Sequence, residues 1–216
     1  MPDDVKLLER LHWLGHASFR LDGPPTIYFD PWRLEGEPPP ADLVLVSHEH
    51  ADHCSPEDVG RIRGPDTVIV ASAGAAAKLG GDARVLRPGE QVTVGEVTIE
   101  GMPAYNVSRF RAPGVPFHPR ENEHVGFVVT VGGERLYFAA DTDRIPEMAG
   151  LNCDVALLPV GGTYTMDAPE AAQAAADIGP RVAIPMHWGA GVAGDQDDAA
   201  RFRDLYPGRV VVLSRQ

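Results

Sequence analysis

Three histidines and one aspartate fall within six consecutive positions of this chain, in the segment 48–53 with the sequence HEHADH. Neutral imidazole and carboxylate groups are the ligands that zinc, manganese, iron and nickel take in proteins. A solvated polar loop is the alternative, but it gives no reason for such a density of these side chains. The segment therefore predicts a metal site, and the first hypothesis for function is a metal-dependent hydrolase.

The spacing within this segment separates the four side chains into two pairs. His48 and His50 are two positions apart, and such side chains point the same way in an extended backbone, so both can bind one ion. Asp52 and His53 lie where a helix is expected to begin and can reach a second ion. Two-metal sites hold their ions about 3.5–4 Å apart, so the spacing suits two neighbouring ions.

Three predicted apolar strands each lead to a histidine or an aspartate that could bind a metal ion. Strand 43–46 leads to His48, strand 136–140 to Asp141 and strand 182–186 to His187. Taken alone, Asp141 could cap a turn and His187 could be a core histidine. In layered α/β folds, however, ligands gather beyond the carboxyl ends of strands, so we expect the three loops to converge. The six expected metal ligands, enough for two ions if Asp141 bridges them, are His48, His50, Asp52, His53, Asp141 and His187.

Strands separated by turns dominate both halves of the chain, with helices between some of them. Period-two and apolar patterns predict strands at 5–13, 18–21, 26–29, 41–46, 67–71, 84–86, 92–99, 125–131, 135–140, 155–160, 182–186 and 210–213. Helices are expected just after His53, where Ser55 is a suitable N-cap, and at 75–79, 169–178 and 197–205. No linker is apparent, so we expect one domain over 1–216, with two similar halves facing each other as one arrangement.

Composition limits the partners of the chain. It has 216 residues, and a net charge of -12 repels nucleic acids and anionic membranes, so a small-molecule substrate is expected, with no nucleic-acid or membrane partner. The sequence does not decide whether the chain forms an oligomer. The first ten residues lack the pattern of a signal peptide, and no apolar run reaches about 18 residues, which predicts a cytoplasmic protein. Cys54 and Cys153 are expected to be reduced thiols.

The motif His48-Glu49-His50-Ala51-Asp52-His53 resembles in full the HxHxDH signature of the metallo-β-lactamase superfamily. Asp141 in YFAADTD and His187 in IPMHW resemble its bridging aspartate and its late histidine ligand. The segments WLGHASF (13–19), DP (30–31) and LLPVGGTYTMDA (157–168) resemble the branch with ascorbate-phosphate lactonases and N-acylphosphatidylethanolamine phospholipase D. The resemblance spans about 11–213 and implies an αββα sandwich of the α/β class, with the metals at the edge between two sheets.

One position departs from the superfamily pattern. The usual third histidine of the first ion should fall near the end of a strand over 97–104, the second strand of a hairpin that begins at 92, and this chain has Asn106 there. An amide oxygen is a weaker zinc ligand than imidazole, so the first ion is expected to be loosely held, completed by water or absent. His118, in the proline-rich segment 103–122, can replace the missing ligand or contact the substrate instead.

The expected reaction is hydrolysis of a small ester, lactone or phosphodiester by a metal-bound hydroxide, because a divalent cation lowers the pKa of bound water to about 7. Asp52 would orient the water and then pass its proton to the leaving group, while His118 and His16 are further candidate catalytic residues. His16 could equally pin the first hairpin. The cofactor is expected to be one or two divalent ions, with zinc first and manganese, nickel or iron as alternatives.

The segment 103–122, with Trp32 and Tyr164, is expected to select the substrate. Its three arginines suit a phosphate or carboxylate group, or they are simply solvated: Arg109, Arg111 and Arg120. Cys54 is not expected to be a nucleophile, because no second histidine is spaced to activate it. The alternatives to a hydrolase are a non-catalytic metal-binding or regulatory protein, which the missing histidine suggests, and a redox di-iron protein.

Overall fold

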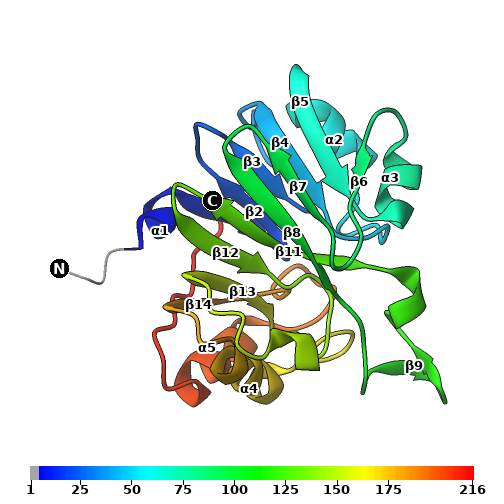
Figure 1. Cartoon of the computed structure of the whole chain (residues 1–216). Helices are drawn as coiled ribbons and strands as arrows, with labels where there is room; N and C mark the ends of the chain where they lie inside the picture. The colour runs from blue at the N-terminus through cyan, green and yellow to red at the C-terminus, as the bar shows by residue number, and fades with distance from the viewer. Residues whose placement is uncertain (1–4) are drawn as a thin grey trace.

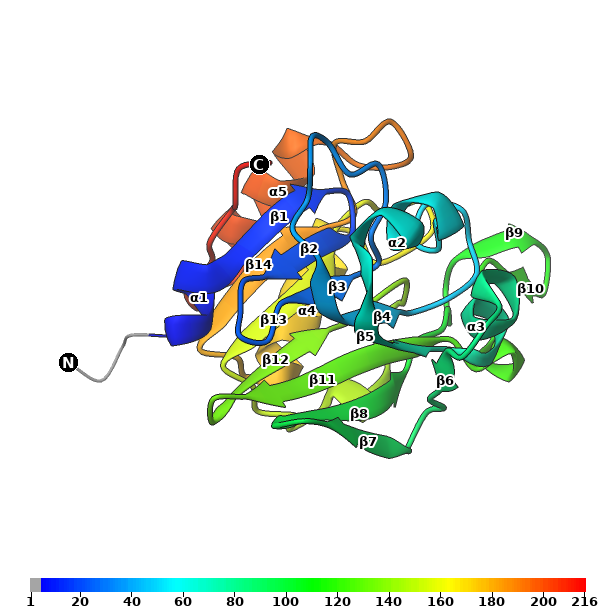
Figure 2. The same ribbon diagram turned by 90° about the horizontal axis from the view of Figure 1, so that it is seen from above.

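Two six-stranded β-sheets face each other in the computed structural model, which describes residues 5–216 (Figures 1 and 2). The first four residues of the expected domain, 1–4, lie outside the described residues. Helices α2 (Pro56–Ile62) and α3 (Ala73–Leu79) cover the outer face of the first sheet. Helices α4 (Ala168–Ile178) and α5 (Gln196–Leu205) cover the outer face of the second. This arrangement is the αββα sandwich that the resemblance implied.

The first sheet has the strand order β1-β2-β3-β4-β5-β6. Its strands are β1 (Leu11–Gly15), β2 (Ser18–Leu21), β3 (Ile27–Phe29), β4 (Ala41–Val46), β5 (Arg63–Ala71) and β6 (Arg84–Val85). The pairs from β1 to β3 are antiparallel, and those from β3 to β6 are parallel. Helix α2 begins where the sequence predicts it, because the Ser55 side chain accepts a hydrogen bond from the backbone nitrogen of Asp58.

The second sheet has the order β14-β13-β12-β11-β8-β7. Its strands are β7 (Gln91–Val94), β8 (Val97–Pro103), β11 (Val125–Val131), β12 (Glu134–Phe138), β13 (Val155–Pro159) and β14 (Val182–Met186). Strands β12, β13 and β14 are parallel, so their carboxyl ends meet at one edge. Short 3-10 helices are η1 (Arg120–Asn122) and η2 (Pro146–Met148). None of the helices within 5–216 is both long and apolar enough to cross a lipid bilayer.

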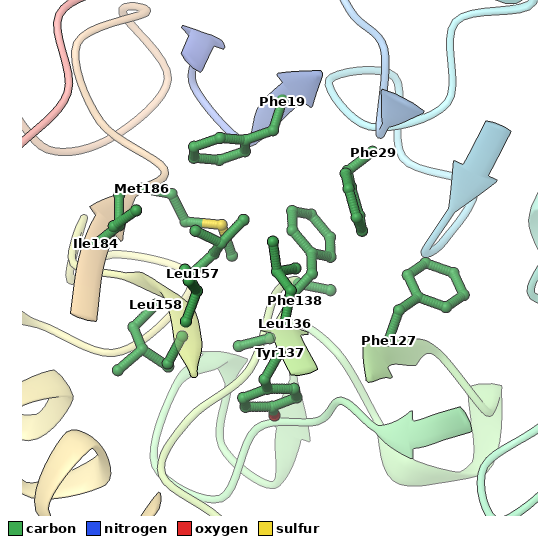
Figure 3. Packing of buried hydrophobic residues seen from close by; sticks show 14 of the residues in the cluster. Phe19, Phe29, Phe127, Leu136, Tyr137, Phe138, Leu157, Leu158, Ile184 and Met186 are labelled. Atoms are coloured by element: carbon green, nitrogen blue, oxygen red, sulfur yellow. The ribbon is translucent and has the colours of Figure 1, made fainter. Parts of the chain in front are cut away.

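Apolar side chains from the inner faces of the two sheets form the main core (Figure 3). The rings of Phe19 and Phe29, from the first sheet, lie 6.5 and 5.5 Å from the ring of Phe138 in the second. A smaller cluster, which includes Val44 and Val59, fills the space between the first sheet and its helices. Burying one such side chain contributes about 1.5–3 kcal/mol, so this core fixes the separation of the sheets and the place of the loops at their strand ends.

Three expected elements differ from the structure. The first half of the strand expected at 5–13 is helix α1 (Lys6–Arg10), and β1 begins only at Leu11. The strand expected at 210–213 forms only an isolated bridge between Val210 and Ala183. The segment 103–122 is not irregular throughout, because it contains a hairpin of β9 (Phe110–Ala112) and β10 (Val115–Pro116) that projects from the body of the molecule (Figure 1).

Helix α1 owes its place to a contact that local sequence does not reveal. The carboxylate of Glu134, at the start of β12, accepts hydrogen bonds from the backbone nitrogens of Lys6 (3.0 Å) and Leu7 (2.9 Å). These are among the amide groups that a helix leaves unpaired at its amino end. A residue far along the chain therefore caps the helix, and it also fastens the amino-terminal segment to the second sheet.

We predict that Glu134→Ala lowers the free energy of unfolding by about 1–2 kcal/mol, because the two amide groups lose their acceptor. Urea unfolding followed by circular dichroism measures this. Glu96→Ala, at an exposed hairpin turn, is the matched control and should change the free energy by less than about 0.5 kcal/mol. Equal changes in the free energy of unfolding for the two variants would show that the Glu134 contact does not stabilise the fold.

Candidate metal centre

The structure brings all six predicted ligands together at the carboxyl ends of three strands. The segment 48–53 follows β4, Asp141 follows β12, and His187 follows β14 directly. His48, His53, Asp141 and His187 are buried, whereas His50 and Asp52 are partly exposed. A seventh side chain, His118, reaches the same place from the loop after β10 and is also buried.

Three histidines form what we call the first group: His48, His50 and His118. The Nε2 atoms of His48 and His118 each lie 3.2 Å from Nδ1 of His50. Asp141 faces this group with Oδ2, which is 3.3 Å from Nε2 of His118 and 3.9 Å from Nε2 of His48. Of the alternatives considered for the missing ligand, the structure therefore places His118, and not Asn106, next to the two motif histidines.

Asp52, His53 and His187 form what we call the second group, and a ring nitrogen of His16 lies within 4.8 Å of a ligand atom of each of them. Asp141 faces it with its other oxygen, Oδ1, which lies 3.2 Å from Nε2 of both His53 and His187. Oδ2 of Asp52 is 3.6 Å from Nε2 of His53. The two oxygens of one buried carboxylate thus face two separate sets of ligand atoms, which is the arrangement expected of a bridging residue.

Unpaired polar atoms in the second group, and the distances between ligand atoms in both groups, show that these groups suit cations. Nε2 of His53, Nε2 of His187 and Oδ1 of Asp141 are buried without a hydrogen-bond partner, and leaving such an atom unpaired costs about 1–3 kcal/mol. The repeated separation of 3.2 Å between ligand atoms matches the edge, about 3.3 Å, of a tetrahedron with zinc–nitrogen distances of about 2.0–2.1 Å. The residues therefore fit one divalent cation in each group.

Asp30, to which the sequence reasoning assigned no role, orients one histidine in each group. Its buried carboxylate accepts hydrogen bonds from Nδ1 of His53 (2.7 Å) and from Oγ of Ser47 (2.5 Å). Because Ser47 donates its only hydroxyl proton to Asp30, its oxygen accepts from Nδ1 of His48 at 2.9 Å. In the neutral form of both histidines, Nε2 is thus the nitrogen that can bind a cation. Asp30 directly follows β3, so the strand-end rule used for the ligands could have found it.

Burial and nearby charges set the protonation of the ligands. Burial lowers the pKa of His48 well below its usual value and that of His118 to about 4, so both imidazoles are neutral, as cation binding requires. Burial would raise the pKa of Asp141, but His187 and His53 outweigh it and hold this pKa well below its usual value. Burial would likewise lower the pKa of His53, yet Asp141 and Asp30 raise it, so a cation bound there displaces a proton.

His16 lies behind the second group and supports it. Its Nε2 is 3.0 Å from Oδ2 of Asp52, and its backbone oxygen accepts a hydrogen bond from the backbone nitrogen of His187 at 2.9 Å. Burial lowers its pKa to about 4, so the imidazole is neutral and can donate one proton to the Asp52 carboxylate. His16 therefore ties the end of β1 to the end of β14 and holds one acid of the centre.

A cleft of about 370 Å³ opens onto both groups. His50, Asp52, His118 and Asp141 reach it, and its other lining residues are Trp32, Ala51, Phe117, Tyr164 and Val192. Trp32, Tyr164 and the segment 103–122 thus border the cleft, as expected. Cys54 does not line the cleft but is buried in the smaller apolar cluster, and burial raises the pKa of its thiol to about 11, so this thiol is protonated at neutral pH.

The three loop arginines are not among the residues that line this cleft, and each has a partner elsewhere. Arg109 pairs with Glu170 on helix α4. Nη2 of Arg120 lies 2.8 Å from Oε1 of Glu147. Nη2 of Arg111 donates to the backbone oxygen of Phe117 at 2.8 Å. The sequence could not reveal the pairing of Arg109 and Arg120, because their carboxylate partners come from segments distant in the chain.

Comparisons with known proteins agree with this geometry. The family model described as "Beta-lactamase superfamily domain" matches residues 10–187. A UPF0173 metal-dependent hydrolase from Methanoculleus marisnigri is 38% identical over 185 residues, which cover 83% of this chain and 80% of the relative. Another, from Methanosphaerula palustris, is 35% identical over 194 residues, which cover 87% of each.

A solved structure from Parabacteroides distasonis, of a protein assigned to the metal-dependent hydrolases, is similar with a TM-score of 0.84 and 32% identity. The match covers 95% of this chain and 93% of that one. The chain therefore belongs to the beta-lactamase superfamily, as one of its metal-dependent hydrolases.

Proposed function

We propose that the chain is a two-metal hydrolase that cleaves uncharged carboxylic esters or lactones. The observation that carries this proposal is the position of Asp141, whose two oxygens each lie within 3.2–3.3 Å of histidine nitrogens from a different group. The first ion would take the first group and Asp141, and the second ion the second group and Asp141. Zinc is the proposed metal, because imidazole with carboxylate at these separations suits it.

Divalent ions in such a site lower the pKa of a bound water to about 7 and polarise a carbonyl oxygen. The residues of the chain supply the other requirements. Asp52 reaches the cleft, and its bond from His16 fixes the carboxylate, so it is placed to accept a proton from the attacking water and pass it to the leaving group. The aromatic walls of Trp32, Phe117 and Tyr164 hold an apolar group and limit the access of water.

The walls of the cleft favour an uncharged substrate. Within residues 5–216, none of the lining side chains is a lysine or an arginine, and the chain carries a net charge of -12. The two ions would attract the reacting group of the substrate, but an additional anionic group that lies away from the ions would meet no countercharge from these lining side chains. The same reaction could cleave a phosphodiester, but the loop arginines that would have bound its phosphate are not among the residues that line the cleft. The regulatory alternative rested on a missing ligand, and His118 supplies a histidine at that place.

We predict that the zinc-loaded protein binds two ions per chain, and that His118→Ala binds about one, because only the first group loses a histidine. Asp141→Ala should lose most of both ions. Zinc content per folded chain, measured by mass spectrometry after removal of excess metal, tests this. His12→Ala, which removes a histidine paired with Asp22 outside both groups, is the control and should retain two ions. Two ions in Asp141→Ala would exclude the bridging role.

A second prediction concerns charge on the substrate. 4-Nitrophenyl butyrate and the 4-nitrophenyl monoester of succinate share a leaving group and differ mainly by one distal carboxylate. We expect kcat/KM to be at least about tenfold higher for the butyrate, since about 1.4 kcal/mol of unfavourable interaction is enough for that ratio. Initial rates at 400 nm give both values. A faster succinate ester, or preferential cleavage of bis(4-nitrophenyl) phosphate, would contradict the proposed substrate class.

A third prediction separates the metal mechanism from a thiol mechanism. Cys54→Ala should keep ester hydrolysis within about twofold of the parent, because the buried, protonated thiol is not needed. Asp52→Asn should lower kcat by about 10²-fold or more, the usual contribution of a general base. Steady-state kinetics on 4-nitrophenyl butyrate compares the two variants. An inactive but folded, metal-loaded Cys54→Ala protein would reverse this assignment.

A further inference from the structure

We infer that Asn106 and Asp143 form a buried relay that positions His118 for the first ion. The inference rests on the proposed function in one respect, that His118 is a metal ligand. The superfamily pattern has a histidine near the end of the strand that corresponds to β8, and this chain has Asn106 there. The third histidine of the first group, His118, comes instead from a loop. A loop histidine needs support that a strand end would otherwise provide, and these two residues are the support that the structure shows.

Every polar position of the buried Asn106 side chain has a partner. Its Oδ1 accepts hydrogen bonds from the backbone nitrogen of His118 (2.7 Å) and lies 3.0 Å from Nδ1 of the same residue. Its Nδ2 donates to Oδ1 of Asp143 (3.0 Å) and to the backbone oxygen of Tyr164 (2.9 Å). A backbone N–H can only donate and a backbone oxygen can only accept, so these contacts settle which end of the amide carries oxygen.

The orientation of the amide selects one tautomer of His118. Because Nδ1 faces an acceptor, it carries the proton, and Nε2 keeps the lone pair that points toward Nδ1 of His50 and Oδ2 of Asp141. Only this tautomer can bind a cation in the first group. Partners of metal-binding histidines commonly change metal affinity by about 10–100-fold when they are removed, and Asn106 holds such a place.

Asp143 anchors the loop that carries His118. Its Oδ1 accepts the hydrogen bond from Nδ2 of Asn106. Its Oδ2 accepts hydrogen bonds from the backbone nitrogens of Val107 (2.8 Å), Ser108 (2.7 Å) and Arg109 (3.2 Å). The backbone nitrogen of Asn106 also donates to the backbone oxygen of His118 at 2.8 Å, which closes the base of the loop.

The place of Asp143 in the chain couples the loop to the metal centre. Asp143 is two residues after Asp141, on the same turn beyond β12. The bridging carboxylate and the anchor of the loop are therefore held by the same short segment of backbone. A loss of the Asn106 amide should disturb the first group more than the second, because Asn106 bonds directly to His118, whereas the hydrogen bonds described for Asn106 and Asp143 do not reach Asp52, His53 or His187.

Asn106→Leu tests the relay, because it keeps the size of the side chain and removes both of its polar ends. Zinc is titrated into metal-free protein against a chelating indicator, which gives a Kd for each ion. We expect the weaker Kd to rise by about 10–100-fold and the other to stay within about threefold. Ser108→Ala, which removes one of several donors to Asp143, is the matched control and should change neither Kd by more than about threefold.

The tautomer of His118 gives a readout that needs no metal. In the ¹⁵N spectrum of the metal-free chain, we expect His118 to be protonated at Nδ1 in the parent and to be a mixture of tautomers in Asn106→Leu. If this variant does not fold, Asn106→Asp replaces it, because it keeps an acceptor for His118 and loses the donor to Asp143. It should show a weakened first ion with the Nδ1 proton retained.

These measurements separate the role of Asn106 and Asp143 from the proposed two-metal function. Two unchanged zinc affinities and an unchanged tautomer in the Asn106 variants, with one ion lost in His118→Ala, would overturn the relay and leave the proposed function intact. A parent protein that binds fewer than two zinc ions would overturn the two-metal function. In that case the tautomer measurement still decides whether Asn106 orients His118.

Discussion

The carboxylate of Asp141 lies between two groups of ligands, and much of the structure serves to keep it there. Burying an ionised carboxylate is costly unless opposite charges and hydrogen-bond donors compensate it. Here His53, His187 and His118 approach its two oxygens, and cations would complete the compensation. Asp141 follows β12, a central strand whose Phe138 packs against the facing sheet, so the main core of the protein fixes the bridging residue.

The ligands around Asp141 depend in turn on buried polar residues that touch no substrate. Asp30, after β3, orients His53 directly and His48 through Ser47. On the other side, Asn106 and Asp143 hold His118. Each sheet thus contributes one buried aspartate that sets the direction of histidine side chains. Hydrogen bonds of this kind restrict the rotation of the histidine side chains, which reduces the ordering that metal binding must otherwise impose.

The strand pattern was enough to predict most of the strands and helices, and the rule about strand ends was enough to predict that the six side chains converge. The αββα layers were implied by the resemblance to the metallo-β-lactamase superfamily and not by local periodicity. Asp30 obeys the rule about strand ends, although the sequence reasoning did not apply it there. The place of His118 could not be settled in advance, since it depends on how the loop after β8 folds back. Helix α1 and the pairing of Arg109 and Arg120 were missed for a related reason: Glu134, Glu170 and Glu147 come from distant parts of the chain.

The central claim is that two metal ions share Asp141, with His118 as a ligand of the first. Anomalous X-ray diffraction at the zinc absorption edge, from crystals of the zinc-loaded protein, tests it most directly. The account predicts two anomalous peaks, one on each side of the Asp141 carboxylate, with Nε2 of His118 about 2.0–2.1 Å from the first. A single peak at the second group, with the His118 side chain turned away from the centre, would contradict it.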